Sequence, residues 1–225
     1  MQSEALLSKL ETAGILEKTD AEELILSDGF RSVVPNYRSK WNTISKDKLL
    51  KDLSDRYADG ASVEAIFADN SDDLARICYF AAIHEELPDV PVEEQIRVAT
   101  LCHSIWEGVS KVEGVPRTFL PVTGKDLPVL INAYQRAIVY VWRQDCDPCD
   151  LVKEDFENIF NPPTNELGLL AVYGPDSAEF LRNRYDIAGA PTTLFVRDGK
   201  VETRLIGAHY RGVFEAEIEK LREYN

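Results

Sequence analysis

Two cysteines separated by two residues, Cys146 and Cys149 in the run Cys-Asp-Pro-Cys, have the spacing that most directly implies chemistry. They follow the apolar run Ala137 to Arg143 and stand at the start of a helix-like segment that begins at Asp147. A helix N-terminus carries partial positive charge and unpaired N–H groups, which favour a thiolate. We therefore expect Cys146 to be an exposed nucleophile at the helix tip. Cys149, one turn inside, would be the thiol that resolves a mixed disulfide.

Other interpretations of this pair remain open. A zinc site would need a second pair of ligands, and the other two cysteines, Cys78 and Cys102, are single. Both lie on apolar helix stripes, which favours core packing over a disulfide or a metal site with His84 and His103. A chance Cys-x-x-Cys is one alternative, and a remnant on a domain that has become structural is another.

The elements that must position the cysteines change character near residue 113. Two amphipathic helices are expected before it, at residues 72–87 and 92–112, in a mostly helical module of residues 1–113. After it, β-branched runs alternate with helical ones in the order βαβαβαββα, with Asp198-Gly199 as a hairpin turn. This order predicts an α/β domain, residues 114–225, with a central mixed sheet flanked by helices.

Residues 116–225 resemble the thioredoxin family, and several motifs in the right order carry the resemblance. The segment Val139 to Cys149, with Trp142, looks like the family's active-site segment, and Ala190-Pro191-Thr192 matches its cis-proline signature. The resemblance implies a thioredoxin-like fold, a cis Ala190–Pro191 bond facing the cysteines, and dithiol–disulfide exchange on protein substrates without a cofactor. A reductase would supply the electrons. Substrate contacts are implied for Trp142, Asp147, Pro148, Ala190 and Pro191.

Two departures from the family pattern bear on the chemistry. Tyr140 stands where many members have a buried carboxylate, and a tyrosine with a pKa near ~10 is a poor base at neutral pH. Glu154 and Asp155 are candidate substitutes for that carboxylate. Asp145, Asp147 and Asp150 surround Cys146 and raise the cost of its thiolate, each by about 1 kcal/mol at low salt, against ~0.3–1 kcal/mol from the helix terminus. The balance predicts a less acidic Cys146 than is usual in the family, and a reductant rather than an oxidant.

The overall charge limits the partners and the setting. The 225 residues include 25 Lys and Arg against 39 Asp and Glu, a formal net charge of −14 at pH 7. Nucleic acids and anionic membranes need a positive surface, so both are disfavoured. The acids are dispersed along the chain, which favours a salt-rich cytoplasm, as in a halophilic archaeon, over an ordinary acidic mesophilic protein. The N-terminus lacks the basic start and apolar run of a signal peptide, so a cytoplasmic location is expected.

The helical module leaves a second function class open. Its helix, hairpin and helix pattern weakly suggests a winged helix, but no basic recognition helix is visible. The alternative to an oxidoreductase is therefore a binding protein. In that case the thioredoxin-like domain is a scaffold and the helical module docks a protein partner.

Overall fold

The computed structural model describes residues 8–19, 24–41, 43–45, 48–49, 51–52, 55, 74–107, 111–162, 164 and 166–223. Its contacts divide the chain into two compact units, Met1–Gly108 and Val109–Asn225. Within the described residues, no helix is both long enough and apolar enough to cross a membrane.

The first unit contains a short antiparallel hairpin and helices. The hairpin pairs β1 (Leu16–Lys18) with β2 (Leu24–Leu26), and the helices are α2 (Asp28–Trp41), α5 (Leu74–Glu86) and α6 (Val92–Glu107). Helices α5 and α6 correspond to the two predicted amphipathic helices. Residues 72–73 and 108–110 of those predictions lie outside the described residues, and Leu87, Lys111 and Val112 are not helical. The expected helical region therefore precedes the α/β half of the chain.

Alternating strands and helices build the second unit. In chain order they are β3 (Leu120–Val122), η1 (Gly124–Asp126), α7 (Leu127–Ala133), β4 (Arg136–Trp142), α8 (Asp147–Ile159), β5 (Gly168–Tyr173), η2 (Gly174–Ser177), α9 (Ala178–Tyr185), β6 (Thr192–Arg197), β7 (Lys200–Ile206) and α10 (Arg211–Glu223).

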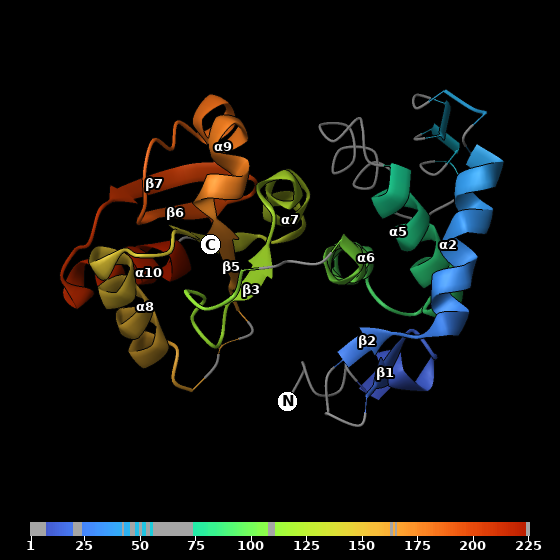
Figure 1. Ribbon diagram of the computed structural model, residues 1–225, viewed down its shortest axis with the longest axis horizontal. Helices are drawn as coiled ribbons and strands as arrows, with labels where there is room; N and C mark the ends of the chain where they lie inside the picture. The colour runs from blue at the N-terminus through green and yellow to red at the C-terminus, as the bar shows by residue number, and fades with distance from the viewer. Residues whose placement is uncertain are drawn as a thin grey trace. The chain divides into compact units, whose positions relative to one another are not determined.

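The five strands form one mixed sheet in the order β3-β5-β4-β6-β7. Strands β3, β5 and β4 are parallel, whereas β6 and β7 run antiparallel to their neighbours. The sheet lies between the pair α8 and α10 and the pair α7 and α9 (Figure 1). The predicted fold class, a central mixed sheet flanked by helices, is confirmed.

Strand β4 is the central strand, and its side chains supply both cores of the sheet. Successive side chains of a strand point to opposite faces. Ile138, Tyr140 and Trp142 therefore pack in the cluster that includes both cysteines and residues of α8 and α10. Val139 and Val141 pack in the other cluster, with residues of α7 and α9. Both faces are covered, which explains why the strand reads as a continuous apolar run.

The β6–β7 hairpin closes at the predicted Asp198-Gly199 turn. Both residues have positive φ, 47° and 74°, as a two-residue turn of the favoured hairpin type requires. A Cβ on Gly199 would meet the exposed side-chain amide of Asn132, which can move aside, so the positive φ is what favours glycine here.

Candidate active site

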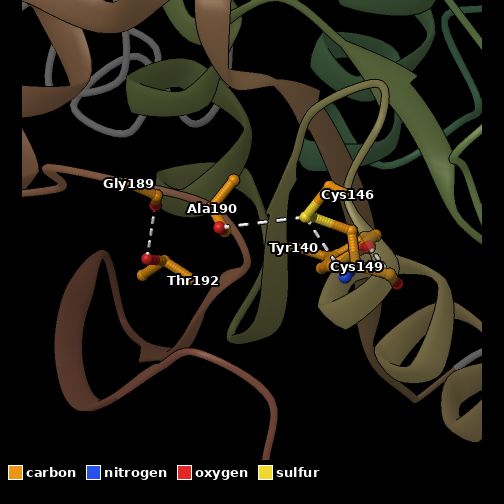
Figure 2. Close-up of a disulfide and its surroundings, with 6 residues drawn as sticks. All are labelled: Tyr140, Cys146, Cys149, Gly189, Ala190 and Thr192. Carbon is orange, nitrogen blue, oxygen red and sulfur yellow. Dashed lines mark hydrogen bonds between the residues drawn. A yellow bond between two sulfur atoms is a disulfide. The ribbon is translucent and has the colours of Figure 1, made fainter.

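Cys146 and Cys149 form a disulfide where β4 passes into α8 (Figure 2). The S–S distance is 2.10 Å and the two Cα atoms are 5.2 Å apart. Cys146 is the N-cap of α8, and its Sγ accepts a hydrogen bond from the backbone N–H of Cys149 at 3.3 Å. Pro148 lies in the first turn, where a missing N–H costs no helical hydrogen bond. The two sulfurs are therefore held at the end of the helix where N–H groups favour negative charge.

The loop before β6 lies against this disulfide. Its Ala190–Pro191 peptide bond is cis. The carbonyl oxygen of Ala190 is 3.9 Å from the Sγ of Cys146 (Figure 2). A disulfide sulfur has no hydrogen to donate, so only the reduced thiol can donate across this gap. The Oγ1 of Thr192 donates to the carbonyl of Gly189 at 2.7 Å, and the N–H of Gly207 donates to the carbonyl of Pro191 at 2.8 Å. These bonds hold the loop where it enters β6.

The expectation that Cys146 is exposed is wrong. Its exposed fraction is 5%, and that of Cys149 is 2%. A helix tip is normally open to solvent, but here Ala190, 44 residues away along the chain, covers the sulfur. The Cys146 sulfur therefore lies next to the loop rather than open to solvent.

Tyr140 lies under the first turn of α8. Its hydroxyl donates a hydrogen bond of 2.8 Å to the carbonyl oxygen of Cys149. Burial, and to a smaller extent the charge of Asp150, raise the pKa of Tyr140 above its ordinary value. This side chain stays neutral through the whole range in which thiols exchange, as the sequence predicts for a poor base. Of the two candidate substitutes, Asp155 pairs with Arg211 on α10 at 2.8 Å, and Glu154 is exposed.

The predicted substrate-contact residues differ in how far their side chains are exposed. Asp147 and Pro148 are exposed beside the disulfide, Ala190 is half-buried and Pro191 is buried. Trp142 is only 2% exposed, so its ring lies beneath the site. That ring stacks at a tilt on Tyr173, with 5.0 Å between centroids. Trp142 can shape the site from below, while its indole face is not offered to a partner.

Three aspartates stand close to Cys146 in the sequence. Asp145, Asp147 and Asp150 are all exposed. Asp145 has a positive φ of 52°, a conformation that aspartate tolerates better than most residues. His209 is exposed as well, with its Nε2 3.1 Å from the carbonyl oxygen of Ile206.

The remaining cysteines belong to the first unit's core. Cys78 and Cys102 are buried thiols with exposed fractions of 0%, which agrees with the core-packing interpretation. Burial raises the pKa of Cys102 to about 12. His84 shares a 2.8 Å hydrogen bond with the side chain of Gln95. Within the described ranges, no three His, Cys, Asp or Glu side chains cluster as a metal site would require.

Sequence reasoning missed a recess on the α9 side of the disulfide. It has a volume of ≈ 160 Å³, and Arg143 and Arg182 line it together with Ala190. Arg143 is three residues before Cys146, and a basic residue beside three acids was the available signal. Arg182 gave none, because only the fold brings α9 next to the end of β4.

No protein-family model matches this chain. Among solved structures, it is similar to a mutant thioredoxin of Entamoeba histolytica, with 21% identity and a TM-score of 0.40 over 45% of this chain and 98% of that one. It is also similar to oxidised mitochondrial thioredoxin 3 of Saccharomyces cerevisiae, with 15% identity and a TM-score of 0.41, over 46% and 95%. A mutant thioredoxin of Halobacterium salinarum shares 19% identity and a TM-score of 0.43, over 49% and 96%.

Proposed function

We propose that this protein is a thiol–disulfide oxidoreductase that reduces disulfides of protein substrates, with Cys146 as nucleophile and Cys149 as resolving thiol. The single observation that carries the proposal is the Cys146–Cys149 disulfide at the N-terminus of α8, with the Cys146 Sγ 3.9 Å from the Ala190 carbonyl. A helix terminus supports a thiolate, and an adjacent backbone carbonyl suits an extended peptide.

The reaction starts from the dithiol form. The Cys146 thiolate attacks one sulfur of the substrate disulfide, forms a mixed disulfide and releases the other substrate sulfur as a thiolate, which takes up a proton. Cys149 loses its proton and attacks the Cys146 sulfur, which releases the second substrate thiol and leaves the intramolecular disulfide. Two electrons have then passed to the substrate, and a partner reductase restores the dithiol. No cofactor is required.

The proposal is tested by insulin reduction with dithiothreitol as electron source, in high and low salt. Wild-type protein should accelerate precipitation of the insulin B chain, and Cys146→Ser should abolish the acceleration. Cys78→Ala, a change at a cysteine in the first unit's core, is the matched control and should retain activity. Activity that survives Cys146→Ser, or that is absent from wild type, would reject the proposal.

A non-catalytic binding protein is the second candidate, and Tyr140 favours it. With a neutral hydroxyl committed to the Cys149 carbonyl, this side chain cannot take a proton from the Cys149 thiol. In this case the second unit is a scaffold and the helical module docks a protein partner. A wild-type protein that is inactive on insulin but retains a stable disulfide would favour this function.

The rest of the proposal concerns the domain boundary and the cellular setting. We place the boundary near residues 113–114, with a helical module of residues 1–113 and a redox domain of residues 114–225. A reducing, salt-rich cytoplasm suits both the dithiol chemistry and the net charge of −14. Neither nucleic acid nor a membrane is part of the proposed function.

A further inference from the structure

The recess beside the disulfide has an apolar lining. Val141, Leu181 and Ile187 line it and are buried, with exposed fractions of 1%, 1% and 5%. Gly189 and Ala190 form another part of the lining, so the loop that covers Cys146 is also a wall of the recess. Its volume of ≈ 160 Å³ matches one medium-sized aliphatic side chain better than a whole cofactor.

Two arginines of the same recess are exposed and available. Neither the Arg143 nor the Arg182 side chain makes an ion pair or hydrogen bond with another described residue. Arg143 directly follows β4, and Arg182 lies on α9. Guanidinium groups are the protein's best-shaped partners for carboxylates, because their N–H groups bind both oxygens at once.

The charge around the disulfide is therefore divided between two sides. Asp147 and Asp150 lie on α8, on one face of the sheet, and Asp145 stands in the turn before α8; all three repel acidic groups. Arg143 and Arg182 line the recess with residues that pack on the α7 and α9 face. A peptide that crosses the disulfide meets negative charge on one side and positive charge on the other.

We propose that this recess is a specificity subsite for an acidic peptide segment that flanks the substrate cysteine. One aliphatic side chain of the segment enters the recess, and a neighbouring carboxylate binds Arg143 and Arg182. The inference rests on the proposed function and names its substrate class. The two arginines attract a carboxylate to the recess, whereas the three aspartates beside Cys146 disfavour an acidic group elsewhere at the site.

The kinetic test uses cyclic peptide disulfides in which Leu and Glu flank one cysteine. Matched peptides have the same sequence with Gln or Lys in place of Glu. Wild-type protein should reduce the Glu peptide with a kcat/KM about fivefold higher than the Gln peptide, the effect of one well-formed ion pair. The Lys peptide should be slower still. Equal rates for the Glu and Gln peptides would overturn the subsite.

Variants assign the preference to the two arginines. The double variant Arg143→Gln with Arg182→Gln should bring the Glu-to-Gln ratio of kcat/KM close to one, because the carboxylate loses both of its partners. The double lysine variant should recover part of the ratio. Lys200→Gln removes a positive charge at the exposed start of β7, at the end of β6 away from Pro191, and should leave the ratio as in wild type. A preference that survives the double glutamine variant would refute the assignment.

A binding measurement separates this inference from the proposed function. Linear peptides with Ser in place of both cysteines are titrated against oxidised protein by fluorescence anisotropy. Tighter binding of the Glu peptide, lost in the double glutamine variant, supports the subsite even if wild type reduces no peptide and the proposed function fails. Equal binding of all peptides overturns it. An arginine-dependent effect seen only with dithiobis-nitrobenzoate, a small dicarboxylate disulfide, would assign the recess to small molecules and also overturn it.

Discussion

The hydroxyl of Tyr140 donates a 2.8 Å hydrogen bond to the carbonyl oxygen of Cys149, which ties the central strand to the first turn of α8. The donor, Tyr140, stands at the position where the thioredoxin resemblance leads one to expect a carboxylate. It is made by a buried group whose pKa is raised, so it persists at every working pH. Tyr140 is thus a positioning residue for the disulfide turn rather than a proton carrier.

Tyr140→Phe should lower the free energy of unfolding by about 1 kcal/mol, the usual net value of one buried hydrogen bond. The pH profile of insulin reduction should keep its shape, because a neutral tyrosine contributes no titration to it. Urea unfolding and rates from pH 5 to 9 measure the two effects. Tyr210→Phe, at a residue that is 90% exposed, is the control and should change neither. A pH profile of insulin reduction that loses its rising or falling part in Tyr140→Phe would contradict the positioning role of Tyr140.

Asp147→Asn should lower the pKa of the Cys146 thiol in the reduced protein by about half a pH unit at low salt, because one negative charge beside the thiolate is removed. The shift should shrink in 1 M KCl, where screening is strong. Thiolate absorbance followed against pH gives the pKa. Glu219→Gln, an exposed charge on α10, should leave it unchanged. A wild-type pKa well below 6 would show that the aspartates do not govern this thiol.

Cys102→Ala should be less stable than wild type at pH 7, and the difference in their free energies of unfolding should shrink as the pH rises above 9. The unfolded thiol ionises near its ordinary pKa of 9.0, whereas the buried thiol does so near 12. Between these values the unfolded state binds fewer protons, so the wild type loses up to ~1.4 kcal/mol per pH unit that the variant does not. Urea unfolding of both proteins at pH 7, 9, 10 and 11 measures the gap. A difference in the free energy of unfolding that stays constant up to pH 11 would contradict this prediction.

The melting temperature should rise when KCl is increased from 0.1 M to 1 M. A net charge of −14 makes the folded chain repel itself, and the screening length falls from about 10 Å to about 3 Å over this range. Circular dichroism melts measure the change, and NaCl at equal ionic strength should give nearly the same curve. A melting temperature that is flat or falling over this range would remove the argument for a salt-rich setting.

The sheet half of the fold could be predicted because its signals are local. Residues of β5 and β6 form short apolar runs between turn residues, and Asp198-Gly199 specifies its own turn. Helix α2 could not be predicted from local signals, because Pro35 in its middle favours a break. The structure carries the helix through it, with Phe30, Val34, Tyr37 and Trp41 buried along one side. Tertiary burial outweighed the local signal.

Parts of the site could not be predicted because they depend on residues far apart in sequence. The spacing of Cys146 and Cys149 indicated a disulfide, but not that Ala190 would cover it. The sequence showed that Tyr140 is no base, yet only the packing of β4 against α8 brings its hydroxyl to a backbone oxygen. That Arg143 and Arg182 line the same recess likewise depends on the fold.

The narrow access to Cys146 makes shape, as well as reactivity, a filter on what this sulfur meets. Because 5% of the residue is exposed and the Ala190 carbonyl oxygen is 3.9 Å from its Sγ, we expect a flexible segment to reach this sulfur more easily than a rigid surface does. We expect bonds buried inside well-folded proteins to be spared and those in slack or damaged segments to be cut. This requirement for a flexible segment acts together with the preference for an acidic flanking segment that we propose for the recess.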